Sequence, residues 1–226
     1  MKEFFKVTNL DRVLKYTFDF PTVDTEKVHL SDMTGRILAG SIVSDIDLPD
    51  FSRSTMDGYA VRGSSTFGAT EGNPAYLTVK GSVAMGESPN FSISTGEVAR
   101  IATGGMLPNG SDSVVMIEHT EALDETTIEI YKSVAPGQHV VETGEDIKSG
   151  EVVLACGQEL RPQEAGLLAA LGKKEAVVYK KPVIGIISTG DEIVPVDKVP
   201  ESGQIRDINT YTLSGQVQEA GGTPVT

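Results

Sequence analysis

The sequence predicts an α/β multidomain protein. A mixed α/β N-terminal domain carries an inserted β-rich domain and is followed by the incomplete start of a doubly wound, Rossmann-like α/β domain. Three observations predict this: strand and helix patterns that stop and later resume, a central stretch of short apolar runs, and a continuous apolar run near the end. We place the first domain at 1–46 and 140–179, the insertion at 47–139 and the third domain at 180–226.

Capping and breaker residues predict the elements of the first domain. A helix is expected from Thr8 to Tyr16, with Thr8 as the N-cap and Asp11 three residues on. The segment 25–46 alternates apolar and polar residues around one turn of Ser, Asp and Gly, which indicates strand, helical turn, strand. Pro162 suits the first turn of a helix that runs to Leu171 and closes at Gly172.

The middle of the chain consists of short apolar runs bounded by Gly, Pro, Asn or Asp. They extend from about Leu48 to Val140 at intervals of roughly ten residues, a spacing typical of a compact β domain. After Pro182 the run VIGII is typical of a parallel strand buried on both faces. A helix from Asn209 to Ala220 and a second strand from Thr223 complete a βαβ pattern. We therefore expect an N-terminal fragment, with an open sheet edge or a disordered tail over 204–226.

Composition excludes several classes of function. The chain has 226 residues, 39% of them hydrophobic, and a formal charge of −13 from 32 acidic and 19 basic residues, which argues against binding nucleic acids or membrane surfaces. Cys156 is the single cysteine and the three histidines fit no metal-ligand spacing, so neither disulfides nor thiolate metal clusters are expected. No signal sequence or spanning segment is recognisable, which predicts a cytoplasmic protein.

Four polar segments are candidates for chemistry, and each also has a purely structural interpretation. Asp57-Gly58 is a turn signal, the glycine-rich stretch 100–110 is either an anion-binding loop or a plain loop, and 144–147 holds a cation or caps the next segment. Ser188 to Glu192 follows the VIGII strand, where ligands bind in open α/β sheets. Asn209 and Thr210 begin the next helix, whose N-terminus favours an anionic group.

In their order along the chain these segments identify a family resemblance. The series STMDGYAVR, RIATGGMLPNGSDSVVMIEHTE, GEDIKSGEVVLACGQELRPQEAGLLAALG, PVIGIISTGDEIV and GQIRDINTYTLSGQVQEAGG resembles the molybdopterin molybdenumtransferase family, including the E domain of gephyrin. The resemblance runs from about Thr25 to the end of the chain. In the family a small residue and valine often stand where this chain has Met106 and Leu107.

The resemblance implies roles for eight residues. Asp57, Thr103, Asp146 and Glu192 match polar positions that the family uses to insert molybdate. Asp57, Asp146 and Glu192 are the expected Mg²⁺ ligands, because Mg²⁺ takes hard carboxylate oxygens and offsets phosphate charge. The alternative is that one of these acids positions a water or a molybdate oxygen by hydrogen bonding, with Thr103 as a neutral donor. The expected binding positions for the pterin substrate are Ser188, Thr189, Gly190 and Asp191.

The resemblance also implies the reaction and the partners. The family converts adenylylated molybdopterin and molybdate into molybdenum-molybdopterin and AMP, assisted by magnesium, in an elongated homodimer; the molybdopterin adenylyltransferase is a further expected partner. The alternative is a gephyrin-like scaffold module without turnover. A molybdopterin-adenylylating protein is disfavoured, since it lacks the MDGYAV and GEDI segments. We expect little transfer activity from the chain as given, because the family's basic molybdate site comes from later residues.

Overall fold

A computed structural model of the chain describes residues 8–226, apart from the side chain of Phe18. The prediction that no signal sequence is present rests partly on residues 1–7, which lie outside the described residues. The chain divides into two compact units, one of Val43–Val153 and one of the residues before and after it. The inserted unit is longer at both ends than 47–139, because backbone pairing of Leu48 with Ile147 ties its first and last segments together.

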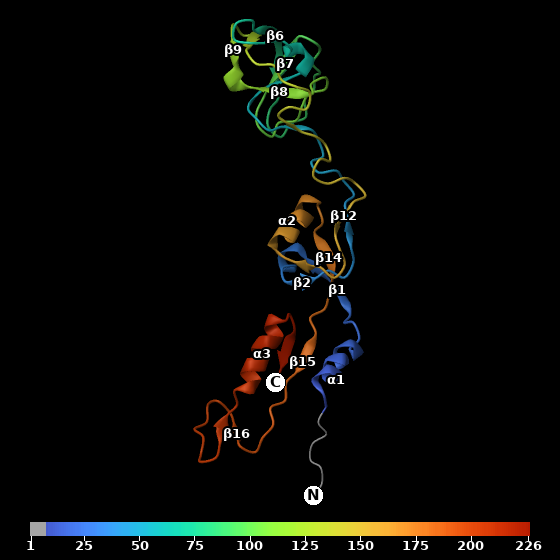
Figure 1. The fold of residues 1–226 in the computed structure, drawn as a ribbon, viewed down its shortest axis with the longest axis vertical. Helices are drawn as coiled ribbons and strands as arrows, with labels where there is room; N and C mark the ends of the chain where they lie inside the picture. Colours follow the sequence, from blue (N-terminus) through green and yellow to red (C-terminus); the bar gives the residue numbers. More distant parts are fainter. Residues whose placement is uncertain (1–7) are drawn as a thin grey trace. The chain divides into compact units, whose positions relative to one another are not determined.

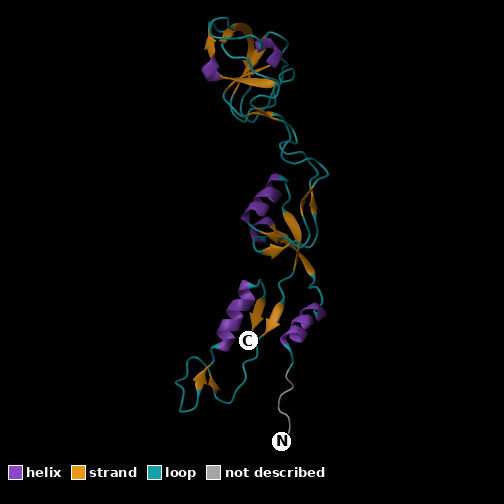
Figure 2. Ribbon diagram, viewed as in Figure 1, coloured by secondary structure: helices purple, strands orange, loops and turns teal. Residues whose placement is uncertain are grey.

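The inserted unit is built on a six-stranded sheet in the order β8-β5-β7-β6-β10-β9. Figure 1 labels β6, β7, β8 and β9 of this sheet, and Figure 2 shows the strands of the unit in orange. Its neighbouring strands are antiparallel except for β6 and β7, which run parallel. The short apolar runs are therefore strands, as predicted. Their bounds are β5 (Gly58–Val61), β6 (Ala75–Ser82), β7 (Glu97–Ile101), β8 (Ser113–Met116), β9 (Thr120–Ala122) and β10 (Thr127–Ile130).

Strand β5 is buried along its whole length because a hydrophobic cluster covers each of its faces. Tyr59 and Val61 point into one cluster, and Ala60 points into the other, as the alternation of side chains along a strand requires. Gly58 completes the strand. An added Cβ at Gly58 would lie 1.9 Å from the carbonyl oxygen of Val115 on β8, so a residue with a side chain does not fit between these two strands.

The second unit begins with short antiparallel strand pairs and two helices. Strand β1 (Thr25–His29) pairs with β14 (Glu175–Tyr179), and β2 (Arg36–Ile37) with β13 (Glu159–Leu160). Strand β3 (Ile42–Val43) pairs with β12 (Val152–Leu154), and the 3-10 turns of the second unit are Tyr16–Asp19 and Leu30–Asp32. The inserted unit has a further strand pair, β4 (Arg53–Ser54) with β11 (Val140–Val141), and the 3-10 turns Gly63–Thr66 and Ile117–His119.

Helix α2 (Pro162–Ala170) opens at the predicted proline and is followed by Gly172 at φ 68°, the left-handed conformation expected after a helix end. Its Leu168 is fully buried, like Leu38 and Val178 of the strands. The N-terminal helix α1 (Leu10–Lys15) is shorter than predicted. Its N-cap is Asn9 and not Thr8, because the Asn9 side chain accepts the backbone N–H of Asp11 at 3.0 Å.

The end of the chain forms the predicted βαβ unit. Strand β15 (Val183–Gly185) runs parallel to β18 (Thr223–Val225), and α3 (Asn209–Glu219) joins them through the small parallel pair β16 (Ile193–Val194) and β17 (Ile205–Arg206). Residues 204–226 form β17, α3 and β18, so the expectation of a disordered tail is wrong. The alternative, an open sheet edge, agrees with the two-stranded β15–β18 sheet of the described residues.

The prediction that VIGII is buried on both faces is wrong for the described residues. Val183 is 69% exposed and Ile187, which follows β15, is 86% exposed. In the part of the chain that the structure describes, β15 belongs to a sheet of two strands, β15 and β18. The described helices include none with the length and apolar composition needed to span a bilayer.

Replacing Gly58 by alanine is expected to destabilise the inserted unit by roughly 3 kcal/mol, because its new methyl group would force β5 away from Val115. Gly72→Ala is the matched control, since a Cβ there meets no atom within 4 Å. Urea unfolding followed by circular dichroism measures both variants. Equal stability of the two would contradict the close approach of β5 and β8.

Candidate active site

Asp57 and Thr103, two of the predicted catalytic residues, meet at adjacent ends of neighbouring strands. Asp57 immediately precedes β5, and Thr103 follows shortly after the end of β7, whose Ile101 pairs with Gly58. The backbone N–H of Thr103 donates to Asp57 Oδ1 at 2.7 Å, and the Thr103 hydroxyl donates to the same oxygen at 2.9 Å. The register of the two strands therefore joins residues that are 46 positions apart.

These two hydrogen bonds fix both the orientation and the charge of the Asp57 carboxylate. The backbone N–H of Thr103, followed by its hydroxyl, lowers the pKa of Asp57 below its ordinary value, because both donors stabilise the ionised form. The side chain is exposed. No hydrogen bond from a described residue reaches Oδ2, so this oxygen is available to a ligand or a substrate.

The glycine-rich stretch that contains Thr103 is tied to the segment before β5. Gly104 donates its N–H to Ser54 at 2.8 Å, and Ser54 donates its own to Gly105 at 3.0 Å. Leu107 donates to Ser52 at 2.9 Å. Since the N–H groups of Gly104 and Leu107 are already paired with backbone carbonyls, the plain-loop interpretation of 100–110 holds for them, and they form no anion cradle.

Asp146 lies apart from the Asp57–Thr103 pair in the contacts that the structure records. It is exposed on the segment after β11, and its backbone N–H donates to the carbonyl of Leu48 at 3.0 Å. Neighbouring Glu145 accepts the N–H of Glu142 at 2.8 Å, so this second acid closes a local turn. These backbone contacts hold the GEDI segment in position and leave the Asp146 carboxylate facing solvent.

Two predicted pterin-binding residues, Ser188 and Gly190, line one cavity of about 500 Å³ after β15. Gly190 adopts φ 151°, and the Glu192 carboxylate lies 2.8 Å from the position where a Cβ on Gly190 would be, so Glu192 folds back over the glycine. Thr189 and Asp191 are exposed neighbours of these residues. The N–H of Ile193 donates to the carbonyl of Gly190 at 3.1 Å, so residues 190–193 form a tight turn that contains Glu192.

Asp207, which the sequence interpretation missed, joins this turn to helix α3. It accepts the Ser188 hydroxyl at 3.0 Å on Oδ1, which also accepts the N–H of Thr210 at 3.1 Å, and its Oδ2 accepts the Thr210 hydroxyl at 2.5 Å. The Thr210 hydroxyl, the Thr210 N–H and the Ser188 hydroxyl all lower the pKa of Asp207. A signal existed: an aspartate just before a helix start is a common capping residue.

The predicted metal ligands do not form a complete cage by themselves. Among residues 8–226 no group of three or more His, Cys, Asp or Glu side chains is arranged to hold a metal ion. Mg²⁺ is usually held by one or two carboxylates together with waters and substrate phosphates, so the free oxygen of Asp57 fits it as a single ligand. The inserted unit also holds 17 of the 32 acidic and six of the 19 basic residues, so an anion approaching Asp57 meets a repulsive field.

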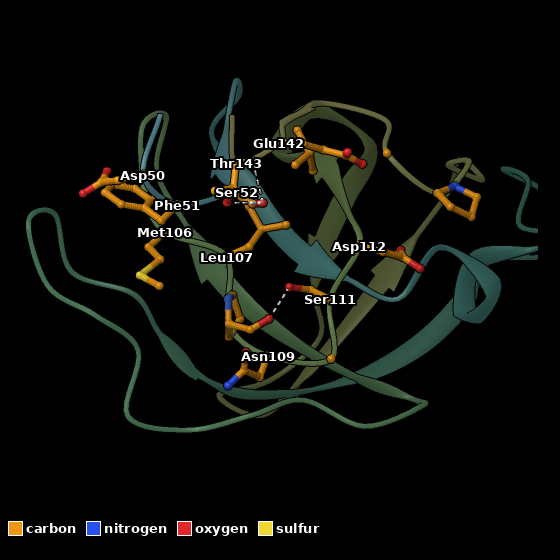
Figure 3. Close-up of a pocket in the computed structure, with 15 residues that line it drawn as sticks. Asp50, Phe51, Ser52, Met106, Leu107, Asn109, Ser111, Asp112, Glu142 and Thr143 are labelled. Atoms are coloured by element: carbon orange, nitrogen blue, oxygen red, sulfur yellow. Dashed lines mark hydrogen bonds between the residues drawn. The ribbon is translucent and has the colours of Figure 1, made fainter. Parts of the chain in front are cut away.

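Figure 3 shows a cavity of about 690 Å³ in the inserted unit that includes none of the eight predicted residues. Met106 and Leu107, the two departures from the family pattern, line it. The hydroxyl groups of Ser52 and Thr143 lie 3.3 Å apart at one side. The Ser111 hydroxyl donates to the carbonyl of Pro108 at 2.6 Å (Figure 3). Asn109 and three acids, Asp50, Asp112 and Glu142, also line the cavity.

Comparison with known families assigns most of the chain. Residues 7–172 match the family model described as the MoeA N-terminal region, domains I and II. The chain belongs to the molybdopterin molybdenumtransferase family. It is 37% identical over 205 residues to the molybdopterin molybdenumtransferase of Bacillus subtilis, covering 89% of this chain and 48% of that protein. Identity to the Haemophilus influenzae molybdopterin molybdenumtransferase is 40% over 194 residues, covering 86% and 46%.

Solved structures of the family have the same fold. The molybdopterin biosynthesis MoeA protein of Pyrococcus horikoshii OT3 superimposes with a TM-score of 0.89 at 39% identity, over 97% of this chain and 59% of that one. A second Pyrococcus structure with the same protein name gives a TM-score of 0.85 at 41% identity, with 97% and 56% covered. This chain of the molybdopterin molybdenumtransferase family therefore spans about half the length of the curated relatives that it matches.

Removing the Thr103 hydroxyl from this member of the molybdopterin molybdenumtransferase family is expected to raise the pKa of Asp57. In Thr103→Ala the backbone N–H still donates, so the pKa moves toward the ordinary value of 3.8 without reaching it. The Asp57 carboxyl then protonates at a higher pH than in the wild type. A pH titration of the Asp57 side-chain carbon by NMR measures the change, with Thr103→Ser as the control that keeps the hydroxyl. An identical pKa of Asp57 in the wild type and both variants would show that the Thr103 hydroxyl does not stabilise the ionised carboxylate.

Proposed function

We propose that the protein acts in molybdenum cofactor biosynthesis by inserting molybdenum from molybdate into adenylylated molybdopterin, with release of AMP. The observation that carries the proposal is the Asp57 carboxylate, ionised and oriented by Thr103, in a chain of the molybdopterin molybdenumtransferase family. A pre-oriented charged group is what such a reaction needs, because no reorganisation is then required when the substrate binds.

Within this proposal Asp57 contacts the reacting groups and Thr103 positions it. Both donors of Thr103 point to Asp57, which argues against the earlier expectation that Thr103 itself donates to molybdate. The free Oδ2 of Asp57 has two possible uses, as a Mg²⁺ ligand or as an acceptor that orients a water or a protonated molybdate oxygen. Both uses require the ionised carboxylate, and the lowered pKa of Asp57 extends the ionised form to more acidic pH.

Magnesium would offset charge that the protein does not. Molybdate and the adenylylated substrate are anions, and the acidic inserted unit repels them. A divalent cation bound to Asp57 and to substrate phosphate would supply Lewis-acid stabilisation of the leaving phosphate. Asp146 and Glu192 remain proposed further ligands. The homodimer and the molybdopterin adenylyltransferase are the proposed partners.

The proposal predicts that Asp57→Asn abolishes AMP release in the gene product at full length, by at least about a hundredfold, since the charge is lost while the shape is kept. Asp124→Asn is a closely matched control. Asp124 also accepts a threonine N–H at 2.7 Å and the hydroxyl of the same residue, Thr126, at 2.9 Å, and it is exposed in the same unit. AMP release from adenylylated molybdopterin and molybdate is measured with and without Mg²⁺.

Complementation of a strain that lacks molybdenum insertion tests the same pair of variants in cells. Wild type and Asp124→Asn should restore molybdoenzyme activity, and Asp57→Asn should not. Unchanged turnover in Asp57→Asn would remove Asp57 from the mechanism. A well-expressed wild type that neither complements nor releases AMP would favour the gephyrin-like scaffold instead.

A further inference from the structure

The cavity after β15 has a lining that suits a neutral heterocycle better than a phosphate. It measures about 500 Å³, within the range of small-molecule sites. Among the described residues that line it there are two acids, Asp197 and Asp207, and no lysine or arginine. The remaining wall is largely apolar, formed by Ile193, Val194, Pro195, Val196 and the ring of Tyr211. A phosphate entering here would meet like charge without a compensating cation.

Asp207 decides what the polar end of this cavity can recognise. A serine hydroxyl has one hydrogen to donate, and Ser188 donates it to Asp207 Oδ1. The oxygen of Ser188 therefore offers lone pairs, and not a hydrogen, to a ligand in the cavity. The N–H of Thr210 at the start of α3 is also bound to Asp207, so it is not available to an anion. The expectation that the Asn209–Thr210 helix start binds an anionic group is thereby disfavoured.

We infer that Asp207 is a positioning residue that fixes Ser188 as a hydrogen-bond acceptor for the N–H donor edge of an aminopyrimidine-type heterocycle. This inference rests on the proposed function, whose substrate contains two such rings, pterin and adenine. Both present amino or ring N–H donors, and both are flat. Tyr211, 60% exposed on the same cavity, offers an aromatic face against which such a ring stacks.

The hydrogen bonds around Asp207 allow variants that separate orientation from charge and from stability. In Asp207→Asn the amide oxygen still accepts from Ser188 and from the Thr210 N–H, while the amide nitrogen donates to the Thr210 hydroxyl. This variant keeps the orientation of Ser188 without the negative charge. Asp207→Ala releases Ser188. Ser188→Ala removes the acceptor and leaves the hold of Asp207 on α3 intact.

Thr210→Val is the matched structural control. It removes one of the three hydrogen bonds to Asp207 and keeps both the Ser188 contact and the Thr210 N–H contact. Asp207→Ala removes all three of these hydrogen bonds and Thr210→Val removes one, so thermal unfolding of each protein measures how much stability each variant loses. A purely structural role of Asp207 would make binding fall with the loss of stability, and Ser188→Ala, which leaves both Thr210 contacts in place, would then bind like the wild type.

The experiment titrates the full-length gene product and its variants with three probes: pterin, followed by its own fluorescence, AMP and inorganic phosphate. The wild type should bind pterin or AMP in preference to phosphate. Ser188→Ala and Asp207→Ala should weaken binding of that same probe about tenfold, the loss of roughly one well-made hydrogen bond. Asp207→Asn and Thr210→Val should stay within about twofold of the wild type. The probe that is weakened identifies the ring, and either ring supports the inference.

Three results would overturn the inference. One is a wild type that binds neither base, or that binds phosphate in preference. Another is a Ser188→Ala variant that binds like the wild type. The third is an Asp207→Asn variant as weak as Asp207→Ala, which would assign the effect to charge. AMP release, measured in parallel, separates this inference from the proposed function. If the base binds in a way that depends on Ser188 but no AMP is released, the proposed function alone is contradicted. If AMP is released and Asp207→Ala binds the base as well as the wild type does, this inference alone is contradicted.

Discussion

The close approach of β5 to β8 at Gly58 is the constraint on which the rest of the candidate site depends. With no side chain at this position, β5 packs between β8 and β7 and buries all four of its residues. Asp57, the residue before Gly58, then lies at the surface in a fixed position. Because the β5–β7 register pairs Gly58 with Ile101, Thr103 lies beside it, and a slip of one residue would separate the two side chains.

The elements of the fold were predictable where local patterns decide them. Turn residues and apolar alternation predicted the strands of the inserted unit, and Pro162 with Gly172 predicted the limits of α2. The burial of the VIGII strand was not predictable in this way, because an apolar run reports what a strand can bury and not which neighbours cover it. The choice of Asn9 over Thr8 as N-cap depends on a single hydrogen bond, at a level of detail that sequence patterns do not reach.

In the candidate site, too, the sequence indicates single residues but not the contacts between residues that are far apart in the chain. The ordered motifs predict Asp57, Thr103 and the STGDE segment as site residues, and they do not say which groups meet. The Ser188–Asp207 contact spans 19 positions, so no local pattern contains it. The glycine-rich stretch was ambiguous from its residues alone. Its assignment as a loop follows from where the N–H groups of Gly104 and Leu107 donate, and that is a property of the folded backbone.

At both Asp57 and Asp124 one threonine donates its backbone N–H and its hydroxyl to the same carboxylate oxygen, an arrangement that we call a clamp. The two clamps have the same distances but differ in the sequence separation of aspartate and threonine. Asp124 and Thr126 are two residues apart, so their clamp requires only a local turn. Asp57 and Thr103 are 46 apart, and closing that loop costs chain entropy that only the assembled sheet offsets. A partly folded chain can therefore carry the Asp124 clamp but not the Asp57 clamp. The Asp57 carboxylate is held in one orientation only where β5 and β7 have paired, so a chain without that pairing presents no organised carboxylate at this position.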